Sequence, residues 1–172
     1  LFIGNSHTYF NDLPELVRQQ CAHKGQPIEI CMLTHGGKGL DFHATEPQTR
    51  FNVLYGGWDT VILQHRAHPM GDLALLEKTL EDILVWVRQA GSRAMLFQTW
   101  TRQGDEAAQE DMSRVYRQLG EKHNIPVIPI GDRWQAYRRE HPDAAFYRSD
   151  GSHAAPAGSQ LAAQVIAEAL CP

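Results

Sequence analysis

Short apolar runs alternate with helical patterns along most of this chain, and this alternation constrains its fold more than any other feature. The segment 72–90 repeats leucine, isoleucine and valine at every third or fourth position and stops at Gly91, which is typical of an amphipathic helix. Five apolar runs are each suited to one strand, at 1–3, 28–33, 58–64, 93–98 and 125–130. Strands that alternate with helices form a parallel sheet with helices on both faces, so the sequence predicts an α/β protein.

Four further segments complete this pattern. Helices are predicted at about 13–23, 105–123, 131–139 and 156–170. The strand at 125–130 contains Pro126 and Pro129, which favour a place near an edge of the sheet. A chain of 172 residues without repeats or linkers is expected to form one domain, 1–172.

Composition excludes several classes of protein. A net charge of −4, with 42% hydrophobic and 21% charged residues, is ordinary for a soluble globular protein and gives no reason to expect nucleic acid as a partner. No apolar run approaches the ~20 residues of a membrane span. The three cysteines, Cys21, Cys31 and Cys171, are an odd number without Cys-x-x-Cys spacing, so we expect buried thiols rather than a metal knuckle or a disulfide framework.

The compartment and the oligomeric state stay open at this point. The sequence starts at Leu1, inside an apolar strand and without methionine, so we expect that residues upstream have been removed. A signal peptide could have been among them, which leaves both a cytoplasmic and a secreted protein possible.

Candidate catalytic residues lie near the two ends of the chain. Ser6 follows the first apolar run, at the carboxyl end of a strand, where open α/β sheets bind ligands. Asp150 and His153 lie just before the last helix. Each group alone is also compatible with an ordinary turn. Together, a serine, a histidine and an aspartate supply a nucleophile, its base and a carboxylate that orients the base.

These two stretches resemble conserved blocks of the SGNH (GDSL-type) hydrolase superfamily. The segment 4–8, Gly-Asn-Ser-His-Thr, is similar to the first block, with Asn5 in place of an aspartate, and Asp150-x-x-His153 is similar to the last. The resemblance therefore spans nearly the whole chain. It implies a flavodoxin-like three-layer α/β/α sandwich with a mostly parallel five-stranded sheet. It also implies ester hydrolysis through Ser6, His153 and Asp150, with an acyl-enzyme and without a cofactor.

The resemblance also implies an oxyanion hole. The glycine-rich segment 34–40 is similar to the second block, in which a glycine N–H, here that of Gly39, joins the N–H of Ser6. The Gly-x-Asn-Asp block, whose asparagine is the third donor, is absent after the strand at 58–64. Gln64 and His68 are the two candidates for that role, and Gln64 is preferred because it ends a buried strand.

Aromatic side chains and histidines near strand ends suggest a substrate site. His7 adjoins Ser6, and Trp100 follows the fourth strand, where it is either core or a wall of the site; Trp58 and Trp100 are possible sugar platforms. The histidines that follow strands lack the paired spacing, with a carboxylate, of a metal site, so no metal is expected.

The expected substrate is a small-molecule or carbohydrate ester, cleaved at a small acyl group such as acetyl. The alternative is a catalytically inactive carbohydrate-binding protein with the SGNH fold. Absence of the asparagine block favours that alternative, and presence of all three triad residue types disfavours it.

Overall fold

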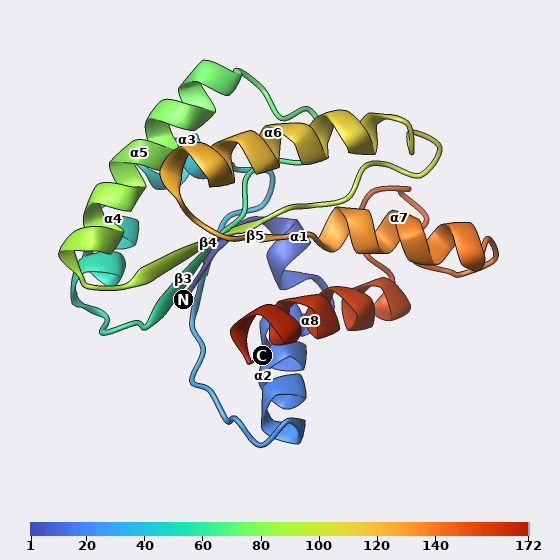
Figure 1. Ribbon diagram of the computed structural model, residues 1–172, viewed down its shortest axis with the longest axis horizontal. Coiled ribbons are helices and arrows are strands. Elements are labelled where there is room, and N and C mark those ends of the chain that lie inside the picture. The colour runs from blue at the N-terminus through green and yellow to red at the C-terminus, as the bar shows by residue number, and fades with distance from the viewer. Residues whose placement is uncertain (172) are drawn as a thin grey trace.

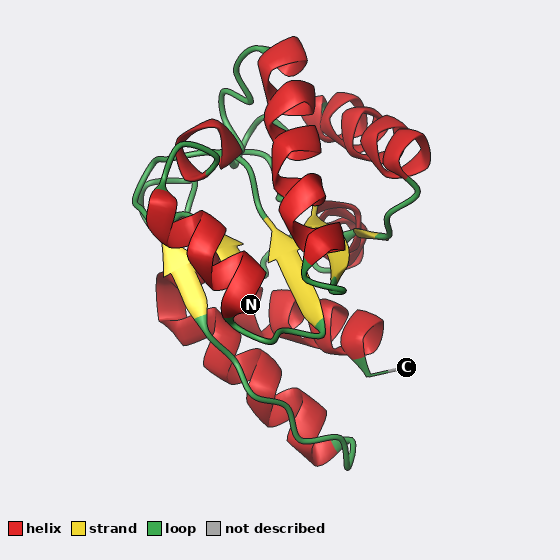
Figure 2. Ribbon diagram, turned by 90° about the vertical axis from the view of Figure 1, so that its left-hand side faces the viewer, coloured by secondary structure: helices red, strands yellow, loops and turns green. Residues whose placement is uncertain are grey.

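The five apolar runs form one parallel sheet in the computed structural model, which describes residues 1–171. The strands are β1 (Phe2–Gly4), β2 (Met32–Thr34), β3 (Thr60–Leu63), β4 (Arg93–Phe97) and β5 (Val127–Ile128). Their order is β2-β1-β3-β4-β5, and every neighbouring pair is parallel. Figure 2 shows the strands as yellow arrows between the helices. The predicted five-stranded parallel sheet is confirmed, with the proline-flanked β5 at an edge. β1 lies between β2 and β3, so the residues that follow it emerge from the interior of the sheet.

Helices cover both faces of the sheet, which makes three layers (Figure 1). One face carries α2 (Leu13–His23), α7 (Ile130–Glu140) and α8 (Pro156–Leu170). The other carries α3 (Leu40–His43), α4 (Pro47–Tyr55), α5 (Leu73–Gln89) and α6 (Ala108–His123).

Strand β3 shows why these runs are continuously apolar. Ile62 packs in the core beside α2 and α8, whereas Val61 and Leu63 pack in the core beside α5. Successive side chains of a strand point to opposite faces, so a strand covered on both faces needs apolar residues at every position.

The structure differs from the predicted elements in three places. A short helix α1 (Ser6–Tyr9) and a 3₁₀ turn η1 (Phe10–Asp12), neither of which was predicted, precede α2, so helical structure begins at Ser6 rather than at about residue 13. β2 begins at Met32 rather than at Ile28 and lies at an edge of the sheet. α3 and α4 were not predicted, since the stretch around them is rich in glycine and polar residues and has little apolar periodicity.

Helices α2 and α8 lie side by side and bring the two ends of the chain together (Figure 1). Asn11 Nδ2 donates to Ala154 O and to Ser159 Oγ, both at 2.8 Å, and so ties the segment after Ser6 to the start of α8. Cys21 and Cys171 are buried between these helices as free thiols, with their Sγ atoms 2.8 Å apart. Within residues 1–171, no helix is both long and apolar enough to cross a membrane.

Candidate active site

Ser6 is presented by a tight turn between β1 and α1. Asn5 has extended backbone angles and its Oδ1 accepts a hydrogen bond from His7 N at 3.0 Å, which caps α1. A Cβ atom at Gly4 would lie 2.5 Å from Gln64 Oε1, so only glycine fits immediately before this turn. The turn places Ser6 as the first residue of α1, directly at the carboxyl end of β1.

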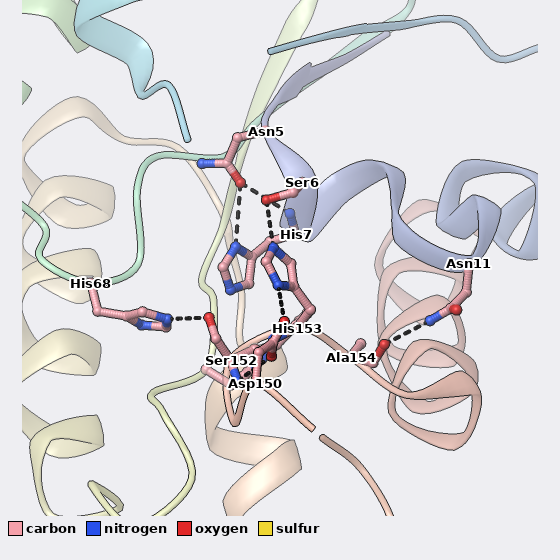
Figure 3. A network of polar contacts seen from close by, with 10 residues as sticks. Asn5, Ser6, His7, Asn11, His68, Asp150, Ser152, His153 and Ala154 are labelled. Carbon is pink, nitrogen blue, oxygen red and sulfur yellow. Dashed lines mark hydrogen bonds and ion pairs between the residues drawn. The ribbon is translucent and has the colours of Figure 1, made fainter. Parts of the chain in front are cut away.

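The three predicted catalytic side chains form one unbroken hydrogen-bonded line (Figure 3). His153 Nε2 lies 2.8 Å from Ser6 Oγ, and His153 Nδ1 lies 2.7 Å from Asp150 Oδ2. The other carboxylate oxygen, Asp150 Oδ1, accepts hydrogen bonds from Ser152 N at 2.8 Å and from His153 N at 2.9 Å. The loop between α7 and α8 therefore holds Asp150 and His153 against each other through contacts that do not involve Ser6.

The surroundings of Asp150 keep it ionised. Burial opposes the charge, but hydrogen bonds from the His153 ring and from the N–H groups of His153 and Ser152 outweigh it and hold the pKa of Asp150 well below its usual range. An ionised carboxylate accepts a hydrogen bond from Nδ1–H, so the Nε2 of His153 is left with a lone pair that faces Ser6.

Two aromatic rings pack against the catalytic imidazole. The Phe10 ring stacks on His153 with ring centroids 4.2 Å apart, and the His7 ring lies 5.2 Å from it. Phe10 was not singled out from the sequence. It lies only four residues after Ser6, but its contact with His153 is visible only in the fold. These contacts restrict the orientation of the His153 ring, the predicted base for Ser6.

Gly39, the glycine that the sequence predicts as an oxyanion donor, lies at the end of the β2–α3 loop. A Cβ atom there would lie 2.6 Å from both Asp41 Oδ1 and His65 Cε1, so the loop passes too close to its neighbours for any side chain. Within residues 1–171, neither Gly39 N nor Ser6 N donates a hydrogen bond to another protein group. The two N–H groups follow the adjacent strands β2 and β1 and are free for a ligand.

The structure corrects the role suggested for Gln64. Its side chain is fully buried, and Oε1 accepts hydrogen bonds from Asn5 N at 2.8 Å and Thr8 Oγ1 at 3.0 Å. Its Nε2 donates to His65 O. The Gln64 amide therefore supports the turn at Ser6 from inside the protein. It has no solvent access, so it does not reach a substrate oxygen.

Gln64→Ala is therefore expected to destabilise the protein rather than to lower the rate alone. The substitution leaves Asn5 N and Thr8 Oγ1 buried without acceptors, at about 1 to 3 kcal/mol for each unsatisfied group. The free energy of unfolding, measured by urea titration, should fall by a similar amount. An unchanged unfolding midpoint with a large loss of kcat would instead restore Gln64 as an oxyanion donor.

Two of the predicted aromatic contacts with substrate are also corrected. Trp100 is fully buried, stacks on Trp134 at 4.2 Å and donates from Nε1 to Ser152 O at 2.9 Å, so it supports the catalytic loop from within the core. Trp58 precedes β3, at the opposite end of the sheet from Ser6, and donates to Asn52 O. Neither indole is placed to carry a sugar at Ser6.

His7 and His68 lie beside the triad. The His7 ring is only 8% exposed, so it offers a substrate little more than an edge, and its centroid lies 5.4 Å from that of His68. His68 is partly exposed; its Nε2 lies 2.7 Å from Ser152 Oγ, and its Nδ1 is buried without a hydrogen-bond partner in residues 1–171. His68 therefore remains the side-chain candidate for a third oxyanion donor.

Several histidines around the site are buried in the neutral form. Burial, followed by the nearby His68 and His153 rings, lowers the pKa of His7 to about 3. Burial also lowers the pKa of His43 and of His65, against the opposing effect of their hydrogen bonds to Gly4 O and Met70 O. Each of these rings gains a proton more readily in the unfolded chain than in the folded protein.

Acid should therefore destabilise the fold before any carboxylate titrates. The unfolded histidine titrates at about pH 6.5, and between that value and the lower native pKa each such ring removes about 1.4 kcal/mol of stability per pH unit. The free energy of unfolding should fall as the pH drops from 7.5 through 6.5 toward 5. Equal urea midpoints at pH 7.5 and pH 5.5 would contradict the neutral assignment.

Within the part of the chain that the structure describes, the loop histidines do not bring three ligand atoms close enough to share one ion. Within residues 1–171, the ligand atoms close enough to share one ion belong to Glu77, Glu81 and His123, on α5 and α6. The histidines at 7, 35, 43, 65, 68 and 153 instead make separate contacts with backbone, hydroxyl and aromatic groups.

Comparison with solved structures identifies this arrangement of strands and helices. No protein-family model and no curated protein matches the sequence. A Parabacteroides merdae ATCC 43184 structure assigned as a GDSL-like lipase is 18% identical, with TM-score 0.76 over 98% of this chain and 93% of the other. A carbohydrate esterase family 3 protein from Talaromyces cellulolyticus is 15% identical, with TM-score 0.73 over 99% and 94%. The Clostridium thermocellum family 3 carbohydrate esterase is 12% identical, with TM-score 0.73 over 100% and 98%. The chain has the fold of the SGNH (GDSL-type) hydrolases.

Proposed function

We propose that this protein is a serine hydrolase that cleaves carboxylic esters through Ser6, His153 and Asp150. The observation that carries the proposal is the line from Ser6 Oγ through the His153 ring to Asp150, with contacts of 2.8 and 2.7 Å. It joins residues from opposite ends of the chain, at the carboxyl end of an interior strand of the sheet. A nucleophile, its base and an orienting carboxylate in hydrogen-bond reach are the groups that acyl transfer requires.

The reaction proceeds in two steps. Ser6 Oγ attacks the ester carbonyl while His153 Nε2 takes its proton, and His153 then gives that proton to the departing alcohol, which leaves an acyl group on Ser6. Water then attacks the acyl-enzyme while His153 Nε2 takes its proton, and His153 returns that proton to Ser6 Oγ as the acid leaves. Asp150 keeps Nδ1 protonated and stabilises the imidazolium that forms in each step.

Two backbone N–H groups and one side chain stabilise the negative charge on the carbonyl oxygen. The free N–H groups of Ser6 and Gly39 are the backbone donors, and loss of one such donor typically raises the barrier by about 3 to 4 kcal/mol. His68, on the loop that follows β3, takes the place of the third donor.

The substrate is proposed to carry a small acyl group, such as acetyl, on a carbohydrate or another small alcohol. Similar structures include carbohydrate esterases and one named an acetyl xylan esterase. The His153 and Asp150 side of the site faces solvent, since these side chains are 24% and 46% exposed, whereas Ser6 is 9% exposed. An open site accommodates a bulky polar alcohol outside the protein while only the acyl group contacts Ser6.

A fluorophosphonate probe tests this proposal without knowledge of the substrate. The probe should add one phosphonyl group, which mass spectrometry of peptides should locate on Ser6. Heat-denatured protein should not react, because the reaction needs the assembled triad. If the folded protein stays unlabelled and cleaves no ester, the alternative of an inactive carbohydrate-binding protein replaces the hydrolase.

Activity should not depend on a metal ion. The proposed steps use only Ser6, His153, Asp150 and hydrogen-bond donors, so dialysis against EDTA should leave kcat for p-nitrophenyl acetate unchanged. A loss of activity that zinc or manganese restores would contradict this mechanism.

A further inference from the structure

Asn5 connects the turn that presents Ser6 to the loop that carries Gly39. Its side chain is almost fully buried. Oδ1 accepts from His7 N at 3.0 Å and caps α1, while Nδ2 donates to Lys38 O at 2.8 Å (Figure 3 shows Asn5 beside Ser6). The Asn5 amide therefore accepts a hydrogen bond from the helix that begins at Ser6 and donates one to the loop that carries Gly39.

The bond from Asn5 determines where the Gly39 N–H points. Lys38 O and Gly39 N belong to the same peptide unit, which is planar, and in a trans unit the carbonyl and N–H point in opposite directions. Fixing Lys38 O therefore fixes the direction of the Gly39 N–H.

The next peptide unit is held as well. Leu40 N donates to His65 Nδ1 at 3.0 Å, and His65 Nε2 lies 2.7 Å from Met70 O. A carbonyl only accepts, so Nε2 carries the hydrogen and Nδ1 is the acceptor. Gly39 thus lies between two restrained peptide groups, while its own N–H donates to no protein group within residues 1–171.

We infer that Asn5 is a positioning residue that aims the Gly39 N–H at the oxyanion formed when Ser6 attacks an ester. The inference rests on the proposed function. Resemblance to the SGNH family puts an aspartate at this position, and an aspartate can accept the His7 N–H but has no hydrogen for Lys38 O. In this chain the amide performs both tasks, and preorganised donors act mainly on the transition state.

Two substitutions remove the hydrogen bond from Asn5 to Lys38 O but keep the cap on α1. Asn5→Asp keeps the cap and loses the donor. Asn5→Ser keeps a capping hydroxyl, is too short to reach Lys38 O and adds no charge. Both variants should lower kcat for p-nitrophenyl acetate by about 10- to 100-fold and change KM less than about 3-fold, which is the pattern of a contact made in the transition state. Asn52→Asp on α4, where Nδ2 donates to Gln48 O, makes the same chemical change away from the site and should leave both constants unchanged.

Fluorophosphonate labelling of Ser6 is the second measurement. Its rate should fall in both Asn5 variants by about the same factor as kcat, because the phosphonyl oxygen uses the same donors. If the parent protein labels and hydrolyses esters while both variants keep its kcat, the hydrolase stands and the role of Asn5 is overturned. A lower melting temperature with unchanged kcat also overturns it, since it shows a structural role alone. A parent protein that neither labels nor hydrolyses overturns the proposed function and this inference with it.

Discussion

Replacing Ser6 by alanine is expected to lower the rate of ester hydrolysis by about 10⁴-fold or more, because it removes the only atom that forms the covalent intermediate. The fold should survive the change. Ser6 Oγ makes one hydrogen bond, to His153 Nε2, and loss of one such bond costs about 1 kcal/mol. The melting temperature should therefore shift by only about 2 to 4 °C. Progress curves with p-nitrophenyl acetate, together with a thermal melt, measure both effects.

A matched control separates catalysis from the loss of a hydroxyl. Ser92→Ala also removes one hydrogen bond, from Ser92 Oγ to Trp58 O at 2.6 Å, at the opposite end of the sheet. That variant should hydrolyse esters at the parent rate. If Ser6→Ala retained a tenth of the parent activity, Ser6 would not be the nucleophile.

Replacing Asp150 by asparagine is expected to lower kcat by about 10⁴-fold through the wrong tautomer of His153. The asparagine oxygen can still accept from Ser152 N and His153 N, as Asp150 Oδ1 does. Its NH₂ group then faces His153 Nδ1, in place of Asp150 Oδ2. Because an NH₂ group donates, Nδ1 becomes an acceptor and Nε2 takes the hydrogen. A protonated Nε2 cannot accept the proton of Ser6.

Asp143→Asn is the control for this variant. Asp143 is exposed in the same loop between α7 and α8. Its substitution removes the same charge without touching His153, so kcat should not change. An Asp150→Asn protein within about tenfold of the parent kcat would mean that the imidazole is oriented by another group.

The sheet and the three candidate catalytic residues could be predicted from the sequence, because strand patterns and short motifs are local, although the contact between Ser6 and His153 spans 147 residues. Strands covered on both faces are apolar at every position, so the five runs marked the strands directly. Ser6 stands immediately after the first strand, while Asp150 and His153 are three residues apart in one loop. That spacing is short enough for the Asp150 and His153 side chains to contact each other within the loop itself.

The roles of the residues around the triad were decided only by the tertiary structure. Gln64 bonds to Asn5 and Thr8, which are 59 and 56 residues away, and that distance in sequence concealed its supporting role. Trp100 follows a strand, as a binding residue often does, yet it is buried against Trp134.

The sequence by itself determined the α/β pattern and the positions of the three candidate catalytic residues, since strand periodicity and short motifs are properties of neighbouring positions. Tertiary structure alone decided that Trp100 is buried against Trp134 and that Asn5 holds the peptide of Gly39. Such contacts form where separate strands end side by side. The packing of the sheet, rather than any local pattern, sets which of those loop residues meet.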